Sequence, residues 1–517
     1  MKNRFVKHAT AILVATGVAI SGFTVIPLAD TAHAASNAIT LYRITTDEAH
    51  TVSQLEQYGI DIWEVQPNFV EAPLTPEQIS QLQADQWTYK MSRQTNGPSF
   101  DSAYRTYDSI QKLLVEKAKQ YPKLAEVVTI GYSFEGQPIL AMKLTNERNN
   151  ADKPKSLWIG GTHAREIAPP EVMLAYIDRL LNGYGTDADA TWMLDSREVW
   201  IVPVLNPDGH RKAEQLLNWR KNTDIRWGSD GVDLNRNYNE KATGIWGNPA
   251  YGTSTNPFSS IYCGPYAFSE PETAAIQQLI ESVMGPTGTP EDVPNGFQMV
   301  VDMHSFGNLI MWPWNWTKDV TQLDAAQDIA RMEKIGRKFS TYNTYKPQIG
   351  SKLYATTGDT TDWAYGYHKI PSFTFEIAKS FWPSGKELPS LIEENMQPFL
   401  YGVKIQDQPY QRVEGPDVLQ LQTSVINGQV VVTGTANDTG NGSQKIQAVE
   451  VFVGKLGQSG TGKQAVLGNS TNAGSIQTFT TMFPAEGLSS GKQLLIVQAQ
   501  DENGAWGAPS AVWVQIP

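Results

Sequence analysis

Cysteine is almost missing from this chain: Cys263 is the single cysteine in 517 residues. An intrachain disulfide is therefore impossible, and a metal site built on several thiolates is excluded. The one thiol lies in the run Ile-Tyr-Cys-Gly-Pro with no histidine close in sequence, which favours a half-buried structural cysteine over a catalytic one. Packing, with bound ions as a possible supplement, must supply the stability of the fold.

Positive charge is also scarce. The chain has 41 Lys and Arg against 53 Asp and Glu, a formal net charge of -12, and no run rich in Lys or Arg. A groove for a polyanion needs such a run, so the composition argues against a nucleic-acid partner. Small molecules and peptides remain open as ligands.

Long apolar runs are limited to the N-terminus. Basic residues among the first seven precede an apolar stretch over 9–26, and Ala32-His33-Ala34 fits a signal-peptidase site. We predict a secretory signal over residues 1–34, and hence a secreted, extracellular protein with no membrane span once the signal is removed. A single membrane anchor is the alternative, disfavoured because Thr, Ser and Gly dilute the stretch and Pro27 ends it.

Residues 35–98 are typical of a small α+β unit. The residue pattern predicts strands over Ile39–Ile44, Ile60–Val70 and Trp87–Met91, a helix over Asp47–Tyr58, and a second helix starting after Thr75. Such a unit between a signal and a larger domain suggests a propeptide, with Ser92–Phe100 as an exposed cleavage region. The alternative is a permanent N-terminal domain.

The remaining chain divides into two further parts and a linker. Residues 99–407 alternate apolar strands with amphipathic helices, which predicts an α/β domain with a mixed, largely buried sheet. The expected strands are Val127–Ile130, Ile139–Leu144, Ser156–Gly160, Glu198–Leu205, Gln298–His304 and Ser372–Ile377. A polar linker over 408–416 leads to residues 417–517, whose short alternating runs and Gly, Asn and Asp turns predict an immunoglobulin-like β-sandwich.

One short turn carries potential metal ligands. Gly160 and Gly161 mark a sharp turn after an apolar strand, and His163 and Glu166 follow with two residues between them. A catalytic Zn²⁺ takes three protein ligands and keeps one position open, and His304 at the end of another predicted strand can supply the third. An isolated pair of this kind is more often a surface histidine near a glutamate, and a histidine in a strand can be an ordinary core residue.

Further motifs give these residues a common context. In chain order they are Thr-His-Ala-Arg-Glu (162–166), Asn-Pro-Asp-Gly (206–209), Trp-Arg-Lys-Asn (219–222), Gly-Val-Asp-Leu-Asn-Arg-Asn-Tyr (231–238), Asp-Met-His-Ser-Phe (302–306), Leu-Tyr-Ala-Thr-Thr-Gly-Asp-Thr-Thr-Asp-Trp (353–363) and Phe-Thr-Phe-Glu (373–376). With these motifs the chain resembles the zinc carboxypeptidases of the pancreatic A/B type, and especially the secreted bacterial carboxypeptidase T group. The resemblance covers roughly residues 100–405 and implies a mixed, eight-stranded type of sheet flanked by helices.

The resemblance implies the metal site and the catalytic groups. It assigns one Zn²⁺ per chain to His163, Glu166 and His304, and Asp233 to the other N–H of His163. Glu376 would be the general base, which takes a proton from the zinc-activated water and passes it to the leaving amine. Arg220 would stabilise the negative charge that develops on the scissile carbonyl; without this context it would be an ordinary solvated residue.

The resemblance also implies how a substrate is held. Asn235 and Arg236 would clamp a free C-terminal carboxylate, Tyr354 would cap the bound peptide, and Arg165 would bind residues upstream of the scissile bond. In the side-chain pocket, Asp359 would attract a C-terminal Lys or Arg, while Thr361 stands where B-type enzymes have an acidic residue. Ile349, Leu353 and Thr374 would line the same pocket. The mixture predicts broad specificity, with apolar residues accepted and basic ones tolerated.

The sequence therefore predicts a secreted zinc exopeptidase acting on peptides and proteins. Phe306 departs from the family, in which a tyrosine is common, and this puts the upstream substrate contacts in doubt. One alternative is a cell-wall peptidase of the same fold that cuts peptidoglycan stems, and another is a non-catalytic surface-binding relative. Calcium binding is compatible with a disulfide-free secreted protein, although the sequence assigns no ligands to it and no ligand to the β-sandwich.

Overall fold

The computed structural model describes residues 38–148, 151–240, 244–319 and 326–517. The predicted signal at 1–34 lies outside the described residues. The chain divides into a unit of residues 1–37 and a compact unit of residues 38–517, and everything below concerns the second unit. Within its described residues, none of the helices has the length and apolar character needed to cross a membrane.

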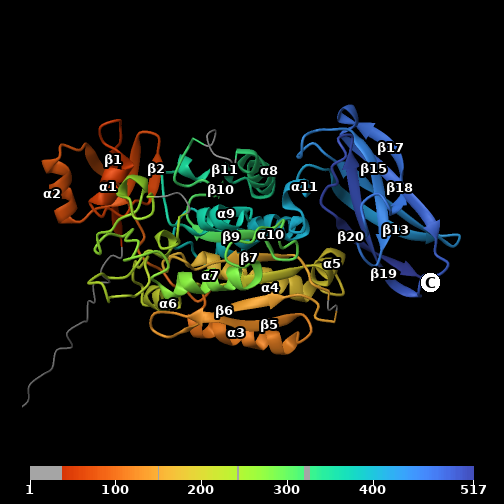
Figure 1. The fold of residues 1–517 in the computed structure, drawn as a ribbon, viewed down its shortest axis with the longest axis horizontal. Coiled ribbons are helices and arrows are strands. Elements are labelled where there is room, and N and C mark those ends of the chain that lie inside the picture. The colour runs from red at the N-terminus through yellow and green to blue at the C-terminus, as the bar shows by residue number, and fades with distance from the viewer. Residues whose placement is uncertain (1–37, 149–150, 241–243, 320–325) are drawn as a thin grey trace, which may run out of the picture. The chain divides into compact units, whose positions relative to one another are not determined.

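The N-terminal part, residues 38–95, is a four-stranded antiparallel sheet with two helices (Figure 1). Its elements are β1 (Ile39–Thr45), α1 (Val52–Gln57), β2 (Glu64–Gln66), β3 (Phe69–Pro73), α2 (Pro76–Ala84) and β4 (Tyr89–Thr95), in the sheet order β2-β3-β1-β4. It has a small apolar cluster of its own, to which Ile44, Leu55, Leu82 and Trp87 belong. A separate cluster allows this part to keep its structure apart from the larger domain.

Three details of this part differ from the expectation. The first helix begins at Val52 rather than Asp47, because Thr51 and Gln54 form a capping box. Asp47 instead accepts hydrogen bonds from the backbone N–H groups of Ala49 and His50, in the turn before the helix. The expected strand Ile60–Val70 is split into the hairpin of β2 and β3, whose turn contains a proline that cannot donate to a ladder. The expected cleavage region Ser92–Phe100 begins inside β4, so only its second half is loop.

The central domain is built on the predicted mixed eight-stranded sheet, in the order β11-β10-β12-β9-β7-β8-β6-β5. The strands are β5 (Ala125–Tyr132), β6 (Pro138–Leu144), β7 (Lys155–Ile159), β8 (Glu198–Val202), β9 (Phe297–Ser305), β10 (Leu309–Trp312), β11 (Lys346–Ile349) and β12 (Ser372–Ile377). The four central strands β12, β9, β7 and β8 are parallel, so the ends that bear functional groups meet along one edge.

Helices cover both faces of this sheet. They are α3 (Tyr107–Gln120), α4 (Ala168–Gly183), α5 (Ala188–Ser196), α6 (Pro207–Glu214), α7 (Pro271–Met284), α8 (Ala326–Asn343), α9 (Thr360–His368) and α10 (Leu388–Ile405), with the short helices η1 (Leu234–Arg236), η2 (Pro249–Tyr251) and η3 (Gly350–Lys352). Residues of α3, α4, α5, α8 and α10 share one apolar core, and residues of α7 and α9 share a second core on the other face. Cys263 is fully buried.

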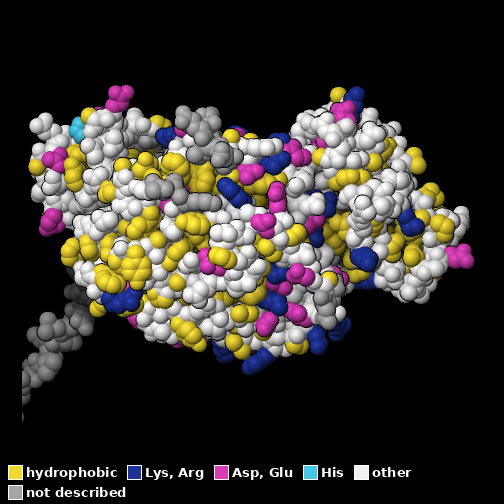
Figure 2. All heavy atoms as spheres, in the orientation of Figure 1, with side chains coloured by type: hydrophobic (Ala, Val, Ile, Leu, Met, Phe, Trp, Pro, Cys, Tyr) yellow, Lys and Arg dark blue, Asp and Glu magenta, His cyan; other side chains and the backbone are white. Residues whose placement is uncertain are grey.

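The long connection between α6 and α7 is irregular, and its outer surface is apolar. Figure 2 shows hydrophobic side chains gathered over the loops near α6. Within this connection Trp227, Tyr266 and Phe258 are 41%, 57% and 77% exposed. The same connection carries Arg220 and the segment around Asp233, so these residues depend on loop packing rather than on a regular element for their placement.

The C-terminal part is a sandwich of two four-stranded antiparallel sheets, ordered β13-β14-β18-β17 and β16-β15-β19-β20. Its strands are β13 (Asp417–Ile426), β14 (Gln429–Asn437), β15 (Ile446–Val453), β16 (Lys463–Gln464), β17 (Val466–Thr471), β18 (Ile476–Pro484), β19 (Gly491–Asp501) and β20 (Ser510–Ile516), with η4 (Asn472–Gly474) between two of them. The expected linker 408–416 forms a short helix, α11 (Pro409–Arg412), and is not an open tether.

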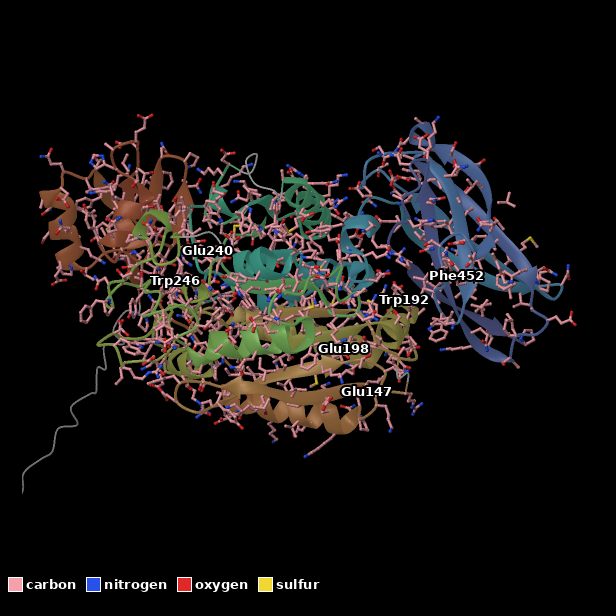
Figure 3. All side chains as sticks on the ribbon, in the orientation of Figure 1. Glu147, Trp192, Glu198, Glu240, Trp246 and Phe452 are labelled. Carbon is pink, nitrogen blue, oxygen red and sulfur yellow. The ribbon has the colours of Figure 1, made fainter. Side chains whose placement is uncertain are left out.

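The sandwich packs directly on the central domain. Leu494, Ile496 and Ala508 belong to the apolar core that α3, α4 and α10 share. Arg412 pairs with Asp407 and also donates to backbone and side-chain oxygens of the sandwich. Trp192 of α5, which Figure 3 labels, lies in the same apolar core. The two parts therefore share one hydrophobic cluster at their junction, and the sandwich has a second core of its own.

Candidate active site

A turn at the end of β7 presents the first two candidate ligands. Gly161 has φ of +63°, and a Cβ there would lie 3.0 Å from Cα of Val204, so both the conformation and the close approach require glycine. The turn brings His163 and Glu166 together, with His163 Nδ1 2.7 Å from Glu166 Oε1. Both side chains are buried.

The adjacent strands β9 and β12 add two further groups. His304 and Glu376 are direct partners in the parallel register of these strands, and they lie at the same edge as the turn after β7. Neighbouring strands are about 4.8 Å apart, so the backbone ladder fixes the separation of the two residues. Sequence reasoning placed both at strand ends but could not show that they are neighbours.

Three side chains converge on a point where a metal ion fits. Nδ1 of His304 lies 3.1 Å from Nδ1 of His163 and 3.0 Å from Oε2 of Glu166. Among the described residues, these three form the one group of His, Cys, Asp or Glu whose ligand atoms all lie within 4.8 Å of one another. Two imidazole nitrogens and a carboxylate facing one another without solvent are mutually unfavourable unless protons or a cation lie between them. Two His and one Glu are a ligand set of catalytic zinc.

Each histidine is oriented from behind by a carboxylate. Asp233 Oδ1 lies 3.1 Å from Nε2 of His163, and Asp302 Oδ2 lies 3.2 Å from Nε2 of His304. With Nε2 bound to a carboxylate, Nδ1 of each ring is the nitrogen that can face a metal. Asp302 was not predicted from the sequence. Its position two residues before His304 on the same strand was the available signal, since such residues share one face.

Glu376 is half-buried beside this group. Burial raises the pKa of Glu376 to about 8, the charge of His304 opposes this rise, and that of Glu166 adds to it. A carboxylate that readily accepts and releases a proton near neutral pH is suited to general acid–base chemistry.

The irregular segment between α6 and α7 supplies cationic groups. Arg220 donates from Nε and Nη2 to the same oxygen of Asp233, at 3.0 and 2.9 Å, which leaves Nη1 for another partner. Arg236 is 2% exposed and is held by the carbonyl oxygens of Gly252 and Asn235. Its Nη2 is buried and lacks a hydrogen-bond partner among the residues the structure describes. A fixed guanidinium with an unused donor is suited to an incoming carboxylate.

Tyr354 and Asn235 complete this wall of the site. Tyr354 is half-buried just after η3, and burial raises the pKa of its hydroxyl while Arg236 and Arg220 oppose that rise. Asn235 lies with its amide nitrogen 3.5 Å from Nε2 of His304, and its oxygen accepts from the backbone N–H of Thr360.

The predicted side-chain pocket contains two buried carboxyl groups. Asp359 caps α9, and its Oδ1 accepts from Asn315, from Thr361 and from the backbone of Asp362. Its Oδ2 is buried without a partner in the described part of the chain. Burial, together with the neighbouring charge of Asp359, holds the pKa of Asp362 well above its usual range. Burial also raises the pKa of Asp359, against the opposing hydrogen bonds from Asp362, Thr361 and Asn315. Thr361 and Thr374 hydroxyls lie 3.4 Å apart in the same pocket.

The N-terminal part covers this site. Arg165, which is 1% exposed, donates from both terminal nitrogens to the carboxylate of Asp61, with Nη2 2.8 Å from Oδ1. The guanidinium carbon lies 4.0 Å from the ring centroid of Phe381, and Trp63 packs edge-on against the same ring. Arg165, which was expected to bind substrate residues upstream of the scissile bond, is thus already paired with Asp61 of the same chain.

A cavity of about 1480 Å³ joins the two parts. Its walls combine side chains of the N-terminal part with the predicted site residues His163, Arg165, Glu166, Arg220, Asn235, Arg236, Tyr354, Asp359 and Glu376. Glu56 of α1 lies nearby, where α1 contacts η2, and is 4% exposed. Burial raises the pKa of Glu56 to about 7 against the opposing charges of Arg236 and Arg220.

Comparison with known proteins agrees with this geometry. The family model described as zinc carboxypeptidase matches residues 110–398. A zinc carboxypeptidase from Saccharothrix mutabilis subsp. capreolus is 29% identical over 296 residues, which cover 55% of this chain and 64% of that protein. Carboxypeptidase A2 from Rattus norvegicus is 29% identical over 374 residues, covering 69% of this chain and 81% of that protein.

Solved structures show the same fold. The crystal structure of thrombin activatable fibrinolysis inhibitor has a TM-score of 0.58 and 22% sequence identity, over 72% of this chain and 99% of that one. Carboxypeptidase A from Helicoverpa armigera has a TM-score of 0.56 and 23% identity, over 72% and 98% of the two chains. These structures leave more than a quarter of this chain unmatched.

Proposed function

Because this chain belongs to the zinc carboxypeptidase family, we propose that it is a zinc-dependent exopeptidase that removes C-terminal residues from peptides and proteins. The single observation that carries the proposal is the convergence of His163, Glu166 and His304 beside the half-buried carboxyl group of Glu376. His163, Glu166 and His304 would hold the zinc ion, which when bound makes the attacking water more acidic.

The residues of the chain then perform the proton transfers and the charge stabilisation. Glu376 accepts a proton from the attacking water and delivers it to the leaving amine, a role favoured by its raised pKa. Arg220 stabilises the negative charge on the scissile carbonyl oxygen through the nitrogen that Asp233 leaves unused. Asp233 and Asp302 keep the two imidazole rings in the orientation that binding requires.

Specificity for a chain end comes from Arg236. Its unpaired, buried Nη2 gives a strong site for a C-terminal carboxylate, and Asn235 and Tyr354 line the same wall. Asp359, Leu353 and Thr374 line the side-chain pocket, and Thr361 donates a hydrogen bond to Asp359. The expected lining residue Ile349 packs against the apolar core instead. The free Oδ2 of Asp359 favours acceptance of Lys or Arg at the substrate C-terminus, beside apolar residues.

We also propose that the N-terminal part, 35–98, is a propeptide that keeps the enzyme latent until it is secreted and cleaved. The proposal is supported by the occupation of Arg165 by Asp61 and by the position of Trp63 against Phe381. A substrate could not reach Arg165 while that ion pair is intact. The loop 96–99, which follows β4, is the segment where cleavage would release this part.

A matched pair of peptides tests the exopeptidase proposal. The mature enzyme should release the last residue from a peptide acid and fail on the same peptide with an amidated C-terminus, because the amide removes the anion that Arg236 binds. Activity should also disappear with a zinc chelator and return with added zinc. Equal rates on acid and amide would show instead an endopeptidase or a cell-wall enzyme.

A further inference from the structure

One end of the β-sandwich gathers three acidic residues from three strand ends. The loop Asp438–Gln444 leaves β14 and leads to β15. Asp417 at the start of β13 is the register partner of Asn437, and Asp501 at the end of β19 is the register partner of Ile446 at the start of β15. The carboxylates of residues 417, 438 and 501 therefore lie at the same end of the sandwich.

Three side-chain oxygens of this loop are buried and accept no hydrogen bond from the described residues. They are Oδ1 of Asp438, Oδ1 of Asn441 and Oε1 of Gln444. Asp438 is 0% exposed and Asn441 is 8% exposed. A buried polar group left without a partner costs about 1–3 kcal/mol. Three such oxygens in one loop of seven residues indicate a ligand that accepts lone pairs.

The remaining polar atoms of these side chains are already used, which fixes the side chains in place. Asp438 Oδ2 accepts from the backbone N–H of Gln444 at 2.6 Å, and Asn441 donates from Nδ2 to the carbonyl oxygen of Gly415. Asp501 Oδ1 accepts from two backbone N–H groups of the following turn. These hydrogen bonds fix the positions of the unpartnered oxygens of Asp438 and Asn441 before any ligand binds.

The negative charges of the buried carboxylates at this end of the sandwich also favour binding of a cation. Burial raises the pKa of Asp438 to about 6, with Asp501 and Asp417 adding to the rise and Lys338 opposing it. Lys338, from α8 of the central domain, pairs with Asp417. Lys338 therefore neutralises Asp417, whereas Asp438 and Asp501 are two further buried carboxylates at the same end of the sandwich.

We propose that this end of the sandwich binds one calcium ion, with Asp438, Asn441 and Gln444 as side-chain ligands and Asp501 as a nearby balancing carboxylate. A carboxylate with two carboxamide oxygens is a hard, all-oxygen set, which suits Ca²⁺ and not the nitrogen- and sulfur-seeking transition metals. The set is separate from the zinc-type group at His163, Glu166 and His304, and it contains no histidine. Magnesium, which demands a near-ideal octahedron and keeps its waters, fits irregular loop oxygens less well.

The site would connect two parts of the protein. Gly415, which accepts from Asn441, lies in the segment that joins α11 to β13, and Lys338 of α8 lies beside the loop, with Nζ 3.1 Å from where a Cβ at Gly440 would be. Calcium would therefore rigidify the junction of the sandwich with the central domain. A ligand that binds only the native state raises the stability of that state.

Calcium titration of the full zinc-loaded chain, after removal of free calcium, tests the proposal. We expect one Ca²⁺ per chain by isothermal titration calorimetry, with a Kd on the order of 10⁻⁴ to 10⁻³ M as in extracellular calcium modules, and a higher Tm with Ca²⁺. Mg²⁺ should raise the Tm less. No heat of binding and an unchanged Tm would show that these oxygens hold water only, and an equal response to Mg²⁺ would overturn the choice of calcium.

Two variants and one control connect the binding to this loop. Asp438→Asn should lose the calcium response, yet its calcium-free Tm should equal or exceed that of the parent, because a buried charge is removed while an oxygen remains for the N–H of Gln444. Gln444→Met should weaken binding and leave the fold intact. Glu486→Gln, an exposed acidic position of the same sandwich, should behave like the parent. Full calcium binding by Asp438→Asn would refute the assignment.

Discussion

The ion pair between Asp61 and Arg165 gives the sharpest test of latency. We predict that Asp61→Asn makes the uncleaved chain markedly active. The substitution keeps the size of the side chain and removes the anion that holds the guanidinium of Arg165. Asp61 lies in the N-terminal part, so cleavage in the loop 96–99 yields a mature enzyme identical in sequence to that of the parent. Any difference between the two proteins must then arise before cleavage.

The size of the effect follows from burial. Arg165 is 1% exposed and packs against Phe381, and breaking a buried ion pair by removing one partner costs about 3–5 kcal/mol. The side chain of Asp61 is 23% exposed, which points to the lower end of that range. A loss of about 3 kcal/mol corresponds to roughly a 100-fold shift toward the state in which the N-terminal part is undocked.

The change in the docking equilibrium can be measured as an activity ratio. This ratio is the activity of the uncleaved chain divided by that of the same sample after cleavage. The ratio should rise by up to roughly 100-fold in Asp61→Asn, until it approaches one. Glu77→Gln, an exposed change in α2, should leave the ratio as in the parent. If uncleaved Asp61→Asn is folded, as judged by circular dichroism, and is as latent as the parent, then the ion pair does not hold the N-terminal part on the site.

Further predictions concern titration, the base and the pocket. Burial raises the pKa of docked Glu56 from its usual 4.5 to about 7, so docking takes up a proton. Docking should therefore weaken by up to about tenfold per pH unit as the pH rises from 4.5 to 7. Glu56→Gln should flatten this dependence in the same activity ratio, and an unchanged slope would contradict the role of Glu56. Glu376→Gln should keep its zinc by metal analysis while kcat falls by about 10²–10⁴-fold, and parental activity would refute the assigned base. Asp359→Asn should keep the cap of α9 and lower kcat/KM for C-terminal Lys or Arg by about 10-fold or more, with C-terminal Leu as the unaffected control.

The sequence predicted the parts of the fold in which local pattern and burial agree. The central strands β7, β9 and β12 are apolar runs buried on both faces, and their ends carry the motifs, so both strands and site residues could be placed. The mixed sheet is confirmed, and so is the family. Strands β10 and β11 were missed because each has four residues, and a proline lies inside β11 while another follows β10. Such short segments give too few positions for a period to emerge.

Contacts between distant segments could not be predicted. Nothing in the sequence around Asp61 indicates that it meets Arg165, because the pairing depends on how two separately folded parts dock. The same holds for Asn315, which orients Asp359 across 44 positions of the chain. Asp302 is a different case, since the two-residue period of a strand already placed it on the same face as His304.

The two appended parts differ in how they could be lost. The N-terminal part keeps its own apolar cluster and meets the central domain through the Asp61–Arg165 ion pair and a small shared cluster of Leu41, Trp63 and Phe381. We therefore expect a single cut to leave two folded pieces. The sandwich also has a core of its own, but it contributes Leu494, Ile496 and Ala508 to the interior of the central domain. Truncation before residue 417 would expose that interior to water, and the shortened enzyme would be prone to aggregate. We therefore expect that removal of the N-terminal part leaves the central domain folded, whereas removal of the sandwich destabilises it.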